Sequence, residues 1–164
     1  MEGFQLKQIR KRSQLATNDQ VWNVMLEVLA EGDADHSGLL FREAKTVVDF
    51  YNEVESGGHE GFLNWKQEEI EEVGSVHYFN ELAQVLYKIG ALEYAKLELE
   101  MGPKIWSLFV QLEKTYTEEK EEVFYQAITM ADNQYEQLHD KISEYLEAYF
   151  LDIHTQIIDV VEDE

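Results

Sequence analysis

The chain has 164 residues, of which 45% are hydrophobic, 34 are acidic and 13 are basic, for a net charge of −21. It contains no cysteine, which excludes disulfide frameworks, thiolate zinc sites and cysteine nucleophiles. No stretch of about 18 apolar residues occurs, and no apolar run follows the basic start, so we expect neither a membrane span nor a signal peptide. We therefore expect a soluble, cytoplasmic protein whose acidic body repels nucleic acid and anionic membranes.

The start of the chain differs in charge from the rest. Four of the 13 basic residues lie in the first twelve positions: Lys7, Arg10, Lys11 and Arg12. We predict a basic N-terminal segment over residues 1–16 and one acidic helical domain over 17–164. The sequence leaves open whether the segment folds back onto the acidic body, pairs with a second subunit or stays mobile.

Apolar residues three or four positions apart dominate the remainder of the chain, which predicts helices. Capping residues such as Thr17 or Asn18 mark a helix start, and glycines such as Gly32 and Gly90 mark helix ends. The predicted helices cover 18–31, 38–56, 75–89, 91–101, 103–116, 118–131 and 135–160, with a short aromatic-rich piece around 62–65.

Glycine and proline set two further boundaries. We expect Gly57 and Gly58 to stop the second helix, and Gly102 with Pro103 to separate two helices. The last helix, 135–160, is the longest and most regular of the predicted helices, and no segment alternates as a strand would. The predicted fold is all-α: a compact multi-helix single domain with a long C-terminal helix.

One string resembles a calcium-binding loop. Residues 33–38 read Asp-Ala-Asp-His-Ser-Gly and match the first six positions of an EF-hand loop. Position twelve is Ala44, whereas the acid, Glu43, comes one place early, and one residue on a helix turns a side chain by about 100°. We interpret the string as a polar turn with Ser37 as a helix cap and expect no metal.

The histidines do not form a known catalytic pattern. His59 begins like a metalloprotease motif, but Leu63 stands where the second histidine belongs. Glu136 and His139 make one Glu-x-x-His pair, and a di-iron bundle needs two such pairs. We therefore predict no catalytic residue and no cofactor, and we do not expect an enzyme.

Acidic residues form a regular series in the last predicted helix. Glu136, Asp140, Glu144 and Glu147 are spaced to share one helix face, about 5–6 Å apart along the axis. Such a row presents negative charge as a phosphate backbone does, and it is the predicted partner-binding face. The alternative is that these acids only keep the helix soluble.

Two segments and one residue pair carry a family resemblance. Residues 52–65 read Asn-Glu-Val-Glu-Ser-Gly-Gly-His-Glu-Gly-Phe-Leu-Asn-Trp, and residues 85–91 read Val-Leu-Tyr-Lys-Ile-Gly-Ala. Together with Asp132 and Tyr135, these segments resemble the bacterial DNA-mimic protein family over roughly residues 20–155. Ser56 and His59 depart from the family's Asn-Gly-Gly-Phe.

The resemblance implies a fold and a role. It implies an all-helical protein that forms a homodimer. Its acidic surface would occupy the DNA-binding site of a basic protein such as a helix-turn-helix regulator. It brings no catalytic residues, and it makes Gly57, Gly58 and Asn64 a fold-signature turn that holds no ligand.

The sequence leaves three other functions open. The same charge suits an immunity or antitoxin-like inhibitor of a basic toxin. A generic helical scaffold would need the charge only for solubility. An enzyme or metal-dependent sensor would use the turn at residues 33–38 or buried carboxylates.

Overall fold

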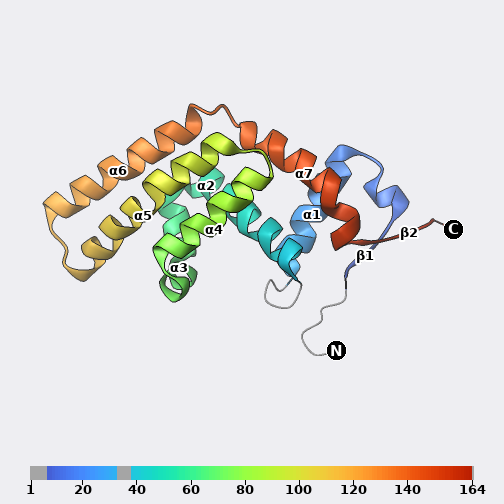
Figure 1. Ribbon diagram of the computed structural model, residues 1–164, viewed down its shortest axis with the longest axis horizontal. Helices are drawn as coiled ribbons and strands as arrows, with labels where there is room; N and C mark the ends of the chain where they lie inside the picture. The colour runs from blue at the N-terminus through green and yellow to red at the C-terminus, as the bar shows by residue number, and fades with distance from the viewer. Residues whose placement is uncertain (1–6, 33–37, 164) are drawn as a thin grey trace. The chain divides into compact units, whose positions relative to one another are not determined.

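The computed structural model describes residues 7–32 and 38–163 (Figure 1). Over these residues the chain is almost entirely helical, so the predicted all-α class with a C-terminal helix is confirmed. The helices are α1 (Asn18–Glu31), α2 (Leu39–Trp65), α3 (Gln67–Val73), α4 (Ser75–Lys88), α5 (Leu92–Lys114), α6 (Glu118–Glu136) and α7 (Lys141–Ile157). None of them, over the same residues, has the length and apolar character needed to cross a membrane.

The residues group into two compact units, which are described separately. The first unit combines the described residues up to Val48 with those from Ser143 onward. The second unit is Asp49–Ile142. The chain passes from one unit to the other within α2 and again within α7.

Two short strands, absent from the sequence prediction, join distant parts of the first unit. β1 (Ile9–Lys11) pairs in parallel with β2 (Asp159–Val161), with Arg10 opposite Val160. Both strands have three residues, which is too short for a recognisable alternation of side chains.

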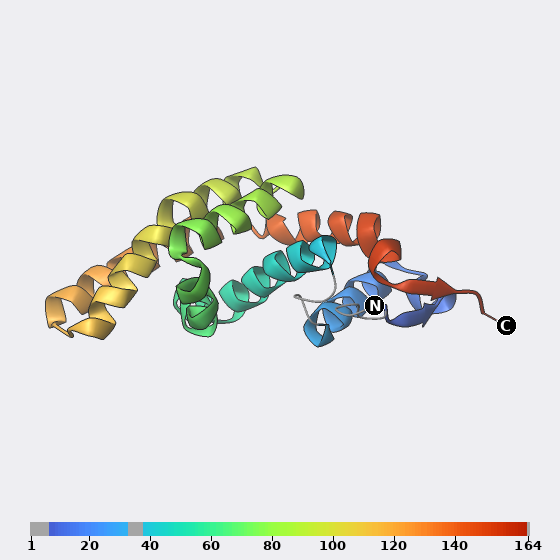
Figure 2. The same cartoon turned by 60° about the horizontal axis from the view of Figure 1, so that its bottom comes forward.

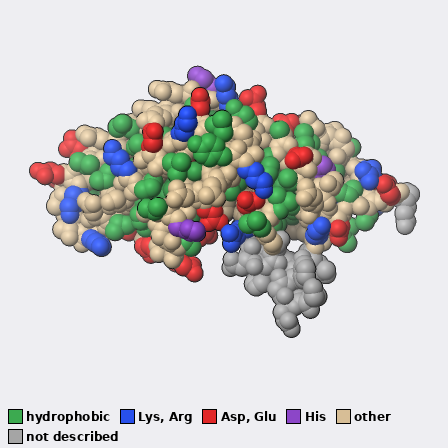
Figure 3. Space-filling view, in the orientation of Figure 1, with side chains coloured by type: hydrophobic (Ala, Val, Ile, Leu, Met, Phe, Trp, Pro, Cys, Tyr) green, Lys and Arg blue, Asp and Glu red, His purple; other side chains and the backbone are tan. Residues whose placement is uncertain are grey.

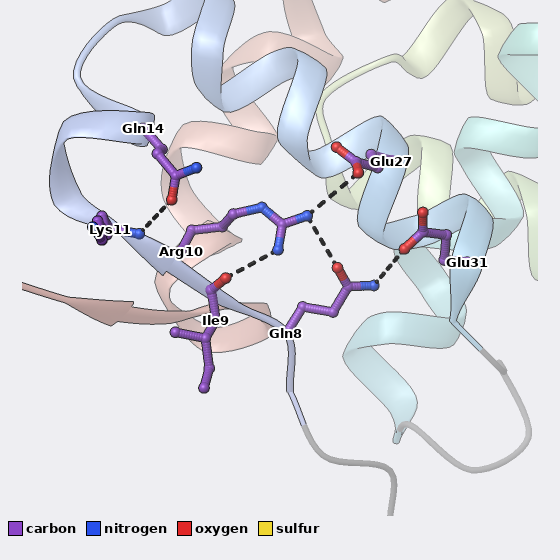
Figure 4. A network of polar contacts seen from close by, with 7 residues as sticks. All are labelled: Gln8, Ile9, Arg10, Lys11, Gln14, Glu27 and Glu31. Carbon is purple, nitrogen blue, oxygen red and sulfur yellow. Dashed lines mark hydrogen bonds and ion pairs between the residues drawn. The ribbon is translucent and has the colours of Figure 1, made fainter.

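The basic segment in front of α1 makes polar contacts with acids of the same unit. The Nε–H of Arg12 is shared between the two carboxylate oxygens of Glu162, each at 2.9 Å. Arg10 lies 3.6 Å from a Glu27 oxygen, and Gln8 donates to Glu31 at 3.0 Å; Figure 4 shows both contacts. Of the three alternatives for this segment, the structure has it folded back, from Gln8 onward, onto acidic residues.

The helix α1 forms as its sequence predicts. The Thr17 hydroxyl accepts a hydrogen bond from the Gln20 backbone, and the Gln20 side chain accepts one from Thr17 N–H, a capping box. The helix ends before Gly32. Its apolar face is buried, and Trp22 beside that face packs on Phe150 of α7, with ring centroids 5.2 Å apart.

The second unit is built on three neighbouring helices. α5 packs against α4 on one side and α6 on the other, as Figures 1 and 2 show. Its core is rich in aromatic rings, which pack edge to face at centroid distances of 5.3–6.3 Å. These rings belong to Phe50, Phe62, Phe79, Tyr94 and Tyr135.

Of the two breaks predicted from glycine and proline, the one at Gly102 and Pro103 is wrong. α5 runs without interruption through Gly102 and Pro103. Pro103 has no N–H to donate to the carbonyl of Leu99. Leu99 lies on the exposed side of α5, where water can donate a hydrogen bond to that carbonyl instead. The predicted stop at Gly57 and Gly58 agrees with the structure, because the non-helical φ and ψ of Gly58 divide α2 into two helices that meet at a kink.

The last predicted helix, 135–160, is also wrong in extent. α6 ends at Glu136 and α7 begins at Lys141. His139 and Asp140, between them, have φ of 57° and 58°, a left-handed conformation that a helix cannot contain. Histidine and aspartate tolerate this conformation better than most residues, so the turn carries little visible signal.

Close packing at Gly102 yields a stability prediction. A Cβ at this buried position would lie 2.3 Å from a ring carbon of Phe79, which is itself fully buried. We expect Gly102→Ala to lower the free energy of unfolding by about 1–2 kcal/mol, because overpacking outweighs the better helix propensity of alanine. Urea unfolding followed by circular dichroism measures the change.

Gly57→Ala is the matched control. Gly57 is exposed and helical, and a Cβ added to it would have no neighbouring atom within 4 Å. This variant should be unchanged or more stable by up to about 1 kcal/mol. Equal effects of the two substitutions would contradict the packing argument.

Candidate functional site

The kink in α2 is held by a side chain from α6. Gly58 has φ 67° and ψ −168°, and this breaks the helical hydrogen-bond pattern around it. The Asp132 carboxylate accepts the His59 backbone N–H at 2.9 Å, as a capping residue does at a helix start. A Cβ on Gly58 would lie 2.8 Å from an Asp132 oxygen, so only glycine fits this contact.

The His59 side chain bridges two carboxylates. Its Nδ1 lies 2.7 Å from Asp132 Oδ1, and its Nε2 lies 2.7 Å from Glu98 Oε2. His59 and Glu98 are fully buried, whereas 35% of the Asp132 side chain is exposed. Both ring nitrogens can donate at once only when the imidazole is protonated.

The two carboxylates determine the charge of His59. Burial alone lowers the pKa of the imidazole, but the Glu98 charge and the hydrogen bonds to Asp132 and Glu98 outweigh it and raise the pKa to about 10. Burial acts against ionisation of Asp132 too, yet its hydrogen bonds with His59 hold its pKa below the ordinary value. The site is therefore a buried cation between two anions.

This arrangement gives His59 a structural role. Both of its nitrogens are engaged and none of its surface is exposed, so neither nitrogen can reach a substrate. Its ring also contacts Phe50 and Tyr135, at centroid distances of 6.4 and 6.2 Å. The metalloprotease-like start at His59 is thus part of the core.

An open cavity of about 580 Å³ lies beside the kink, within the second unit. Four carboxylates, a histidine and a tyrosine contribute to its wall, together with two glycines and a valine. The residues that line it are Val54, Glu55, Gly57, Gly58, Asp132, Tyr135, Glu136, His139 and Asp140. It lies where α6 ends and α7 begins, so the partial charges of the two helix ends oppose each other there.

The structure divides the predicted acidic series. Glu136 and Asp140 line the cavity, whereas Glu144 and Glu147 lie on α7 in the first unit. The expectation of one row on one helix is wrong, because the left-handed turn at His139 and Asp140 interrupts the helix.

The three residues of the predicted fold-signature turn do not lie together at the site. Gly57 and Gly58 form part of the cavity wall, and Gly58 contacts Asp132. Asn64 is exposed, and its amide donates to the Glu60 carbonyl within α2, so it is not part of the site. The calcium-like string lies outside the described residues except for Gly38.

Sequence reasoning missed Glu98, and it left Glu55 without a role. A signal for Glu98 exists: it lies within one helical turn of Tyr94, Ala95 and Met101, which are all buried. A lone acid on such an apolar face needs a buried partner. The sequence does not show which residue that partner is.

Comparisons with known proteins add no relative. No protein-family model, no curated protein and no solved structure matches this chain.

The raised pKa of His59 gives a pH prediction. Protonated His59 is favoured by folding, so its contribution to stability is complete below about pH 6.5 and is lost as pH rises toward about 10. Glu98→Gln removes the negative charge that contributes most to raising the pKa of His59. The pKa of His59 should therefore fall, and the variant should lose less stability as the pH rises. Melting temperatures from pH 6 to 10 and an NMR titration of His59 measure this.

His77→Gln serves as the control because His77 is largely exposed. It should leave the alkaline part of the melting profile unchanged. A wild-type His59 that titrates near pH 6.5 would rule out the buried bridge.

Proposed function

We propose that this protein is an acidic binding module that occupies the DNA-binding surface of a basic protein, such as a helix-turn-helix regulator. The observation that carries the proposal is the acid excess of the second unit, which holds 20 acidic and 7 basic residues. A protein of this charge is attracted to surfaces built to receive phosphates.

The acids concentrate at particular places on the second unit. α3 exposes Glu68, Glu69, Glu71 and Glu72, and acidic side chains gather over this helix in Figure 3. The first turns of α6 hold Glu118, Glu119, Glu121 and Glu122. Elsewhere on the face in Figure 3, lysine and arginine are interspersed with the acids.

Some of these acids are explained by their position at a helix start, and this explanation needs no binding partner. Acids in a first turn stabilise the helix through its dipole, and both α3 and α6 have them there. Glu136 follows no such rule, because it ends α6, where negative charge is unfavourable, whereas Asp140 directly precedes α7. Glu136 is therefore the stronger candidate for contact with a basic partner.

Exposed apolar side chains favour a second candidate, a dedicated inhibitor of one basic toxin. Val123, Tyr125 and Met130 on α6 are each 42–50% exposed, close in sequence to acids of the same helix. Tight interfaces combine an apolar centre with a charged rim, whereas DNA competition needs only the charge.

A pull-down from the source cytosol at low salt, with and without duplex DNA, tests both functions. We expect one or a few basic DNA-binding proteins, which DNA releases and whose affinity falls steeply with salt. A single partner that DNA does not release would establish the dedicated inhibitor instead. Retention of nothing specific would contradict both proposals.

The divided acidic series provides matched variants for any partner found. Glu136→Gln with Asp140→Asn, and Glu144→Gln with Glu147→Gln, each remove two negative charges. Asparagine at position 140 keeps a residue that tolerates the positive φ found there. We expect the first pair to weaken partner binding by about tenfold and the second by about twofold or less.

A further inference from the structure

We propose that the basic segment in front of α1, residues 8–13, is an autoinhibitory contact. In the free protein it occupies acidic residues of the first unit that would otherwise bind the basic partner of the proposed function, on which this inference rests. These acids are Glu27 and Glu31 of α1, and Glu162 and Asp163, which follow β2.

The charge balance of the first unit depends on this segment. The first unit holds the 14 acidic and 6 basic residues of the chain that lie outside the second unit. Four of the six basic residues lie in or next to the segment: Lys7, Arg10, Lys11 and Arg12. The rest of the first unit therefore has an acid excess at least as large as that of the second unit. A basic partner would be attracted to it once the segment is displaced.

On α1, the segment presents an arginine to acids as a basic partner would. The Arg10 guanidinium lies 3.6 Å from a Glu27 oxygen, and only 17% of the Arg10 side chain is exposed. The same guanidinium donates to the Gln8 side-chain oxygen at 3.0 Å, and the Gln8 amide donates to Glu31 at 3.0 Å (Figure 4). Glu27 and Glu31 lie about one helical turn apart, so the segment contacts two acids on the same face of α1.

Beyond β2, the segment contacts two more acids. The Nε–H of Arg12 is shared between the Glu162 oxygens, and the backbone N–H and hydroxyl of Ser13 both donate to Asp163. These hydrogen bonds hold the pKa of Glu162 and the pKa of Asp163 below their ordinary values. Both acids are therefore ionised and already have donors, which a partner would have to replace.

The contacts of the segment are of a kind that a partner can displace. β1 and β2 share three residue pairs, and 65% of the Arg12 side chain and 72% of the Glu162 side chain are exposed. Exposed ion pairs contribute little to stability. The chain connection gives the segment an effective concentration on the order of millimolar, so a partner must offer several cations at once to compete with it.

The test measures binding of a fluorescein-labelled octa-arginine peptide to the full chain by fluorescence anisotropy at low salt. Arg10→Gln with Arg12→Gln should bind the peptide about fivefold more tightly than wild type, because the acids become available. Lys104→Gln with Lys114→Gln is the control, because it removes the same charge from exposed positions of α5. It should tighten binding by about twofold or less.

Two substitutions on α1 locate the effect. In the wild type, Glu27→Gln with Glu31→Gln should weaken peptide binding by about twofold or less, because the segment already covers both acids. In the Arg10 and Arg12 variant, the same two substitutions should remove most of the gain. Such non-additivity is expected of groups in contact and not of a change in net charge alone.

A single substitution separates release of the segment from loss of structure, because Arg10 is largely buried and Arg12 is exposed. Arg12→Gln alone should keep the melting temperature of the wild type. It should still bind the peptide about twofold more tightly than Lys114→Gln, its control.

Equal gains in the arginine variant and the lysine control would overturn the inference, as would a gain that persists without Glu27 and Glu31. If these results appear while the chain still holds a partner that DNA releases, only this inference fails. If the expected gain is found but the pull-down retains nothing specific, the segment still shields these acids and only the proposed function fails.

Discussion

The second unit depends on one buried interaction, the charge of His59 held between Asp132 and Glu98. It joins the kink of α2 to α5 and α6 through hydrogen bonds of 2.7 and 2.9 Å. A buried ion is costly unless its partners are fixed, so these three helices have little freedom to shift relative to each other at this point. Asp132, together with Gly58 at the kink, also lines the acidic cavity.

Local rules predict much of this fold and little of this site. Thr17, Gly32 and the apolar spacing of α1 act within one helix, so their effects could be foreseen. The pairing of His59 with Glu98 spans 39 positions, and its pairing with Asp132 spans 73. Nothing in a single sequence states such pairings, so the site could not be assembled from it.

The wrong helix boundaries have a shared cause. Gly102 and Pro103 are unfavourable inside a helix, but contact with Phe79 favours the continuous form. At His139 and Asp140 the reverse holds, because two residues without a strong turn signal end a regular apolar pattern. Tertiary packing decides both places, and propensity is only a weak guide there.

The pairing of β1 with β2 has a consequence for the order of folding. It joins segments about 150 positions apart, as the contact of Arg12 with Glu162 shows. Bringing such distant segments together costs chain entropy that three residue pairs cannot offset alone. The strands therefore close only after the helices between them have folded, and their loss would be the first step of unfolding in the first unit.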